Sequence, residues 1–232
     1  MITNTARVTT TRLKIDALMN DGTRPYSYVH DPMEIYRQSF ATVRTEANLD
    51  SLPTDIADVA VRLIHACGMT DITDDLKYHT NAAKAGRAAL KAGAPILADV
   101  EMVAAGIIRS RLPANNKIIC TLNDNRTPDH ATTISNTRSA AAVDLWRDHL
   151  DGAVVVIGNA PTALFRLLEL ILDGAPKPAV IMGFPVGFIG ATESKQALAE
   201  FGHDIPFITL LGRRGGSAIA SASVNALSGE PA

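Results

Sequence analysis

The chain of 232 residues carries 22 lysines and arginines against 24 acidic residues, so its net charge of -2 gives no general attraction to nucleic acid or to anionic membranes. Hydrophobic residues make up 47% of the chain, which is enough for one large core. No apolar run approaches the ~20 residues that span a bilayer, and the two cysteines, Cys67 and Cys120, lack metal-ligand spacing. We therefore expect a cytoplasmic protein with no disulfide, metal or membrane partner.

The ends of the chain differ in composition from its middle. Residues 1–24 are polar and mixed in charge, without the apolar centre of a signal peptide, and predict a mobile extension. Residues 228–232 predict a short tail. Between them we find no repeat and no low-complexity linker, so we expect one domain over residues 25–227.

Two helices are predicted in the first 70 residues. Asp31 can cap the first of them, Pro32 suits the first helical position, and Glu34 completes a capping-box-like arrangement. The second helix is predicted to begin near Pro53 and to end at Gly68.

His65 lies near the end of the second predicted helix. Asp58, Arg62 and His65 fall at i, i+4 and i+7, away from the apolar stripe of that helix, which is Ile56, Val59, Ala60, Leu63 and Cys67. A histidine in such a place can change protonation near neutral pH. Taken alone, the pattern favours a solvated surface histidine.

From residue 94 onward, short apolar runs alternate with helical patterns. The runs of strand length are 94–98, 118–122, 153–157, 179–182 and 206–210, and the helical patterns are 100–111, 137–150, 160–172, 192–201 and 216–227. Residues 86–90 belong to another predicted helix, before the first of these runs. Continuously apolar strands separated by helices indicate a sheet that is covered on both faces. We predict an α/β fold: a mainly parallel sheet with helices on both faces, in a Rossmann-like layering, after an N-terminal helical segment.

Ligands of such sheets bind beyond the carboxyl ends of the strands. Residues 212–217, Gly-Arg-Arg-Gly-Gly-Ser, follow a strand and open a helix there, and their arginines and backbone N–H groups suit carboxylates or phosphates. A tight turn with solvated arginines explains the segment equally well. Its spacing is neither a dinucleotide fingerprint nor a P-loop. The apolar loop 183–188 could press on a flat ligand or serve as a rigid connector.

Two further strand ends and one helix start carry candidate polar groups. The turn 159–162 has backbone donors at a helix start, where capping is the simpler interpretation. Arg138 begins a predicted helix, where the helix dipole favours acids, and this slightly favours a role in holding a ligand. Asp99 and Glu101 are two residues apart and point to different sides of a helix, which argues against a paired-carboxylate site. No order typical of a Ser-His-Asp triad occurs.

Taken in order, these segments resemble the precorrin-8X methylmutase family of corrin biosynthesis. The resemblance covers about residues 26–227 and rests on eight stretches, which are 31–40, 62–68, 93–103, 137–142, 158–164, 185–188, 193–195 and 212–217. Members of the family often have cysteine where this chain has Ala98, a difference that puts no chemistry in doubt.

The resemblance implies an isomerase of cobalamin and porphyrin biosynthesis. It would move a methyl group from C-11 to C-12 on ring C of precorrin-8X, giving hydrogenobyrinic acid or its cobalt counterpart, with no cofactor. The resemblance makes His65 the catalytic proton donor and acceptor, places Ser39, Arg62 and Arg138 in the substrate site, and implies a homodimer with a tetrapyrrole as ligand. A corrinoid-binding carrier would use the same arginines without needing His65. A methyltransferase would need a nucleotide-binding glycine loop, which the sequence lacks.

Overall fold

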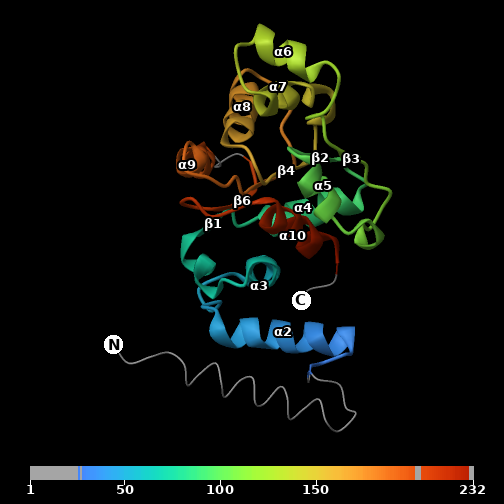
Figure 1. Ribbon diagram of the computed structural model, residues 1–232, viewed down its shortest axis with the longest axis vertical. Helices are drawn as coiled ribbons and strands as arrows, with labels where there is room; N and C mark the ends of the chain where they lie inside the picture. Colours follow the sequence, from blue (N-terminus) through green and yellow to red (C-terminus); the bar gives the residue numbers. More distant parts are fainter. Residues whose placement is uncertain (1–25, 27, 202–204, 230–232) are drawn as a thin grey trace. The chain divides into compact units, whose positions relative to one another are not determined.

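The computed structural model describes residue 26, residues 28–201 and residues 205–229 (Figure 1). The predicted extension over residues 1–24 and the last three residues of the predicted tail lie outside these ranges. The chain divides into two units, with the boundary between Ser39 and Phe40. The prediction of one domain over residues 25–227 stays a prediction. Among the described helices, none combines the length and the apolar character needed to cross a membrane.

Helix α2 (Pro32–Glu46) begins where the sequence predicts, and the unit boundary falls within it. The Asp31 carboxylate accepts a hydrogen bond from the Met33 backbone N–H at 2.8 Å, which caps the helix. The prediction for Glu34 was wrong, because its carboxylate accepts from Arg37 and Gln38 one turn further along instead of reaching back to the cap. Pairing at i+3 and i+4 on an exposed helix face competes with the capping box.

Helix α3 (Thr54–Cys67) ends at Gly68 as predicted. Gly68 adopts the left-handed conformation, with φ of 70°, and its N–H donates to the Ile64 carbonyl at 2.7 Å. A glycine reaches this conformation without the steric cost of a Cβ atom. The helix therefore stops immediately after the turn that carries His65.

The second unit contains a six-stranded sheet in the order β1-β6-β5-β4-β2-β3. The strands are β1 (Leu76–Tyr78), β2 (Ile96–Ala98), β3 (Ile118–Ile119), β4 (Val154–Ile157), β5 (Val180–Gly183) and β6 (Phe207–Leu210). All neighbours pair in parallel except β1, which runs antiparallel to β6 at one edge. The predicted α/β fold with a mainly parallel sheet is confirmed.

Alternate residues of the central strands enter two different cores. Val154 and Val156 belong to one cluster, whereas Val155 and Ile157 belong to the other. Successive side chains of a strand point to opposite faces, so the two clusters lie on the two faces of the sheet. Both faces are covered by helices, as predicted.

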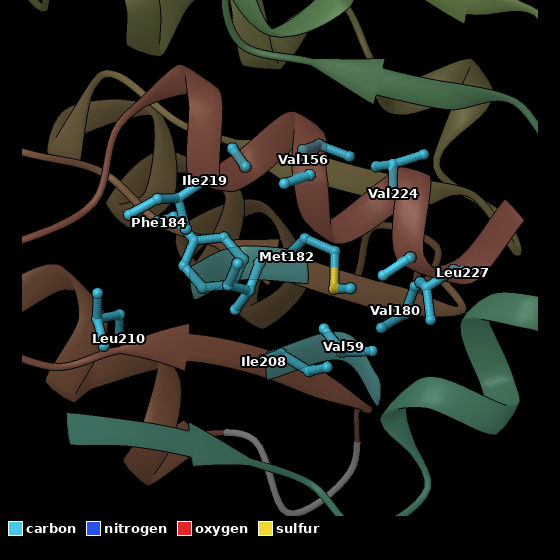
Figure 2. Packing of buried hydrophobic residues seen from close by; sticks show 14 of the residues in the cluster. Val59, Val156, Val180, Met182, Phe184, Ile208, Leu210, Ile219, Val224 and Leu227 are labelled. Carbon is cyan, nitrogen blue, oxygen red and sulfur yellow. The ribbon is translucent and has the colours of Figure 1, made fainter. Parts of the chain in front are cut away.

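One face is covered by α3, α4 (Ala82–Lys91), α5 (Glu101–Gly106) and α10 (Ser217–Ser228), and the other by α7 (Arg138–Asp144), α8 (Pro161–Leu172) and α9 (Ala191–Phe201). Figure 1 shows α7 and α8 on one side of the strands and α3 on the other. Figure 2 shows the first core, in which Val59 of α3 and Val224 of α10 pack with Met182 and Ile208 of the sheet. The sheet thus separates α3 from α7.

Two elements were missed by the sequence analysis. Strand β1 has only three residues and one exposed side, so its apolar pattern is too short to recognise. Helix α6 (Thr127–Thr133) is polar and packs on α7 rather than on the sheet. Two predicted helices were also too long: the helix over 100–111 breaks after Gly106, and the one over 137–150 breaks after Asp144, each being followed by a single 3-10 turn.

Candidate active site

His65 lies on an exposed face of α3, as its spacing predicts. Its imidazole meets the Phe40 ring edge-on, with 5.1 Å between the ring centroids and 76° between the planes. The Arg62 guanidinium lies over the same ring, 5.2 Å from its centroid. One aromatic ring therefore holds both the histidine and the arginine, through a T-shaped contact and a cation–π contact. The sequence analysis did not predict this contact of Phe40 with His65 and Arg62.

Asp58, the third polar residue of the predicted face, is not exposed. Only 9% of Asp58 is accessible, and its carboxylate accepts a 2.8 Å hydrogen bond from Arg44. The sequence pattern could not show this, because the residue that covers Asp58 comes from the preceding helix. The polar face of α3 that remains open consists of Arg62 and His65.

Arg138 begins α7 and is exposed. Its Nη2 donates to the Leu122 carbonyl at 3.1 Å and to the Asn123 side-chain oxygen at 3.2 Å. These bonds orient the guanidinium and use one of its two terminal nitrogens. The fork thus has donors left for a ligand on a surface that water and solutes can reach.

The start of α7 is fixed by hydroxyl groups. Thr137 accepts a hydrogen bond from the Ala140 N–H at 3.1 Å and donates to the Thr162 hydroxyl of α8 at 2.8 Å. In the loop between β3 and α6, Thr121 donates to the Ala142 carbonyl at 2.7 Å. Side-chain capping together with these contacts keeps Arg138 on a rigid base.

Asp99 closes the turn at the start of α8. Only 2% of Asp99 is accessible, and its carboxylate accepts hydrogen bonds from the N–H groups of Gly158, Asn159 and Ala160 at 2.9, 2.9 and 3.0 Å. Burial raises the pKa of this carboxyl above its usual value, while the three N–H groups oppose that rise. The interpretation of the turn as a helix cap was wrong, because no side chain caps α8 and Asp99 instead binds the N–H groups of the turn that precedes it. The donors there are not free for a ligand.

The two arginines of the 212–217 loop have different partners. Arg214 forms ion pairs with Asp71 and Asp75 at 2.7 and 2.6 Å, whereas the Arg213 guanidinium lies 5.3 Å from the centroid of the Phe188 ring. Both predicted roles, anion binding and a solvated arginine, were therefore wrong for Arg214. Its charge is neutralised by two acids from the 3-10 turn over Thr70–Asp75, which follows α3.

The loop after β5 exposes apolar side chains. Phe188 is 85% accessible and Ile189 is 91% accessible, and Val186 is also exposed. Backbone bonds join this loop to the next one: the Gly216 N–H donates to the Phe184 carbonyl at 2.9 Å, and the Gly187 N–H donates to the Arg213 carbonyl at 3.3 Å. The two glycine-rich loops therefore present one apolar tip, flanked by a cation.

Lys195 is a buried residue whose role the sequence did not reveal. It is fully buried, and its Nζ donates to the Arg214 carbonyl at 2.6 Å. Burial lowers the pKa of Lys195 from 10.5 to about 8. The only sequence signal for such a position is that Lys195 shares a helical face with Ala191 and Leu198, and this signal does not identify the acceptor. Lys195 anchors the loop that carries Arg213 and Arg214.

Of the three predicted site residues in the second unit, the structure brings two together. His65 and Arg62 share the Phe40 ring, whereas Arg138 belongs to a helix on the opposite face of the sheet. Arg138 follows β3, which is four strand spacings from β6, or roughly 19 Å. Ser39 is the last residue of the first unit and lies on α2. Within the described residues, no group of three or more histidine, cysteine or acidic side chains could hold a metal ion.

Three comparisons identify proteins similar to this chain. The sequence profile of the family described as precorrin-8X methylmutase matches residues 34–229. A precorrin-8X methylmutase of Pseudomonas aeruginosa is 61% identical over 203 residues, which are 88% of this chain and 98% of that protein. One from Sinorhizobium is 56% identical over 87% of this chain and 96% of its own length.

More distant relatives are also named methylmutases of precorrin-8 compounds. A cobalt-precorrin-8 methylmutase of Priestia megaterium is 33% identical over 85% of this chain and 87% of its own length. Among solved structures, a precorrin-8x methyl mutase from Thermus thermophilus superposes with a TM-score of 0.76 at 36% identity, covering 84% of this chain and 94% of the other. The profile match over residues 34–229 includes all six strands.

We predict that Lys195 makes stability depend on pH in alkaline solution. Since the folded pKa of about 8 lies below the ordinary 10.5, the folded state binds fewer protons than the unfolded state between these values, and stability rises with pH across this window. Urea unfolding at about pH 7.5 and about pH 10 should show wild type gaining about 2 kcal/mol relative to Lys195→Met. Equal pH dependence in both proteins would mean that Lys195 titrates normally.

Proposed function

Because the chain belongs to the precorrin-8X methylmutase family, we propose that it moves the methyl group from C-11 to C-12 on ring C of precorrin-8X, with His65 as the acid. The chain is an isomerase of cobalamin biosynthesis. The observation that carries the finer proposal is the exposed imidazole of His65, which is held edge-on by Phe40 beside Arg62. Such a shift is intramolecular, so the product has the mass of the substrate and no methyl donor is consumed.

His65 would act on the ring C nitrogen. A proton or hydrogen bond donated there withdraws electron density from the neighbouring C-11, weakens its bond to the methyl group, and favours the product tautomer. The migrating methyl forms its bond to C-12 as the bond to C-11 breaks, and the proton returns to His65 when the product leaves. General acid catalysis of this kind contributes typically 10²–10⁴-fold, or roughly 3–5 kcal/mol. Rigid binding of the ring would contribute the remainder through orientation.

Arg62, Arg138 and Ser39 would bind the carboxylate arms of the ring. The substrate carries many acetate and propionate groups, and a guanidinium fork suits a carboxylate. A chain with net charge -2 needs such local cations to hold a polyanion. Arg138 retains free donors beside its two protein acceptors, which supports this role. A tetrapyrrole is large enough to reach more than one of these residues.

We propose metal-free precorrin-8X as the substrate rather than the cobalt form. Relatives named precorrin-8X methylmutase are 61% and 56% identical, whereas a cobalt-precorrin-8 methylmutase is 33% identical. Turnover rates on the two substrates would test this choice. A corrinoid carrier remains the second candidate, and it would bind the ring without converting it.

We further propose a cytoplasmic homodimer in which the corrinoid cleft lies at or near the subunit interface. A flat ring with charged arms on all sides is difficult for one strand-end crevice to surround. The segment that we expect one copy to lend is the loop around Gly187, because its Phe188 and Ile189 are exposed apolar side chains. The loop at Gly215, which is hydrogen-bonded to it, would move with it.

We expect the purified protein to convert precorrin-8X with nothing added, and His65→Ala to lose 10²–10⁴-fold or more in turnover while still binding product. Absorption spectroscopy follows the reaction, and mass spectrometry checks that the mass is unchanged. His149→Ala is the matched control, since His149 is exposed and carries no proposed role. Binding without turnover in wild type would favour the carrier, and near-normal turnover of His65→Ala would remove His65 from the mechanism.

Arg62→Ala and Arg138→Ala should each weaken corrinoid binding by about 1–3 kcal/mol, because each removes charge-assisted hydrogen bonds to a carboxylate arm. Titration of hydrogenobyrinic acid by absorbance gives the dissociation constants. The exposed Arg147, replaced by alanine, controls for the general loss of positive charge. Unchanged affinity at low salt would take the arginine concerned out of the site.

Light scattering should give twice the chain mass for wild type, and a smaller mass for Ile189→Asp, because a carboxylate would be buried in the proposed interface. Leu172→Asp is the control, since Leu172 is also exposed and apolar but lies at the end of α8. A dimer that is unaffected by Ile189→Asp, or equally weakened by both substitutions, would contradict the proposed place of the interface.

A further inference from the structure

Helix α4 presents a basic stripe on the side away from the core. Its buried residues are Ala82, Ala83, Gly86 and Leu90. Lys84, Arg87 and Lys91 recur at i, i+3 and i+7, so they share one face of the helix. The three cations therefore stand in a row on a helix whose other face is fixed in the core.

Close packing holds α4 in place. A Cβ atom on Gly86 would lie 2.6 Å from a Leu227 side-chain carbon of α10 and 3.3 Å from one of Val180 in β5. Only a glycine allows the helix backbone to approach these neighbours so closely. The basic stripe next to Gly86 is thus carried by a rigid support, as a preorganised binding site requires.

The stripe borders a cavity of about 430 Å³. Its lining residues are Asp55, Lys84, Arg87, Ala88 and Lys91. This volume falls within the range of small-molecule sites, about 300–1,000 Å³. Three cations against one carboxylate give the lining a net charge of +2, in a chain whose own net charge is -2.

Arg87 is the central residue of this lining. Its Nε and Nη2 are buried, and neither has a hydrogen-bond partner among the described residues. Buried donors without a partner are costly, and more so on a charged group. Nη1 is not among the covered atoms and forms no hydrogen bond within the described residues, so it is the guanidinium nitrogen that a ligand in the cavity can reach.

Asp55 does not neutralise the stripe. Its carboxylate accepts a hydrogen bond from the Ile56 N–H at 3.0 Å, at the start of α3, where the helix dipole favours an acid. None of Lys84, Arg87 and Lys91 forms an ion pair within the part of the chain that the structure describes. The positive charge at the cavity is therefore available to a ligand.

We propose that this cavity binds a small oxyanion, a carboxylate or a phosphate, with Arg87 as the guanidinium donor and Lys84 and Lys91 as flanking charges. The site differs from the one proposed for the tetrapyrrole. Asp55 and His65 are ten residues apart at opposite ends of α3, which separates the cavity from the imidazole by roughly 15 Å. The proposal does not depend on the chemistry of His65.

The test is calorimetric titration of the full chain with inorganic phosphate and, separately, with succinate, at matched ionic strength in sodium chloride. Arg87→Met keeps the apolar stem volume and should weaken anion binding at least tenfold. Arg87→Lys keeps the charge but not the guanidinium, and its affinity for the anion should lie between those of wild type and Arg87→Met. Lys84→Met combined with Lys91→Met is a second variant with substitutions on the outer face of α4. Arg147→Met and Arg62→Ala are the controls, and thermal melting checks that each protein is folded.

Binding of either anion that is weakened by Arg87→Met and unchanged in both controls supports the site, and the tighter of the two anions identifies the ligand class. Absence of binding by both anions overturns the proposal. Equal loss in Arg147→Met would mean that the whole surface charge attracts the anion, and equal loss in Arg62→Ala would mean that the anion occupies the tetrapyrrole site. Either result would also overturn it.

Discussion

The buried carboxylate of Asp99 joins the carboxyl ends of two neighbouring strands. It follows β2, and its oxygens accept the N–H groups of the turn between β4 and α8. Without it, three donors at the start of α8 would be buried beside the sheet without partners, which is a cost that native proteins avoid. Because Thr162 of this turn bonds to Thr137, the same constraint extends to the helix that carries Arg138.

A second buried contact fixes the loop that follows β6. The buried Lys195 donates to the carbonyl of Arg214, whose guanidinium in turn pairs with Asp71 and Asp75 after α3. The loop that ends β6 is thereby joined both to α9 and to the turn that follows His65. The loops at the carboxyl edge are thus held by buried polar groups, and the side chains left accessible are the ones that a ligand can use. This fits the family's chemistry, in which a large ring has to be held still while one small group moves within it.

Few of the side chains discussed at the carboxyl ends of the strands remain accessible to a ligand. His65 and Arg62 on the Phe40 ring, Arg138 on α7, and the apolar tip at Phe188 are separated by the sheet or by several strands. Two of these groups, Arg62 and Arg138, are the cations that we propose to hold the carboxylate arms of the tetrapyrrole. The basic cavity beside α4 is of a different kind, since its three cations converge on a volume suited to a small anion.

Local patterns in the sequence determined most of the fold. Five of the six strands could be predicted from short apolar runs, because a strand covered on both faces needs apolar residues on both. The exposed place of His65 followed from the helical period, and the end of α3 followed from Gly68. The family followed from the order of eight short segments, and the profile match confirmed it.

Only the tertiary structure decided which polar side chains remain accessible to solvent. Asp58 and His65 share a helical face, yet Arg44 covers the first and leaves the second exposed. Asp99 and its three donors are about 60 residues apart, and Arg214 and its acids about 140, so no local period relates them. A polar side chain becomes structural or functional according to the partner that folding brings to it. That partner comes from long-range packing, whereas the sequence period reports only the face on which a residue lies.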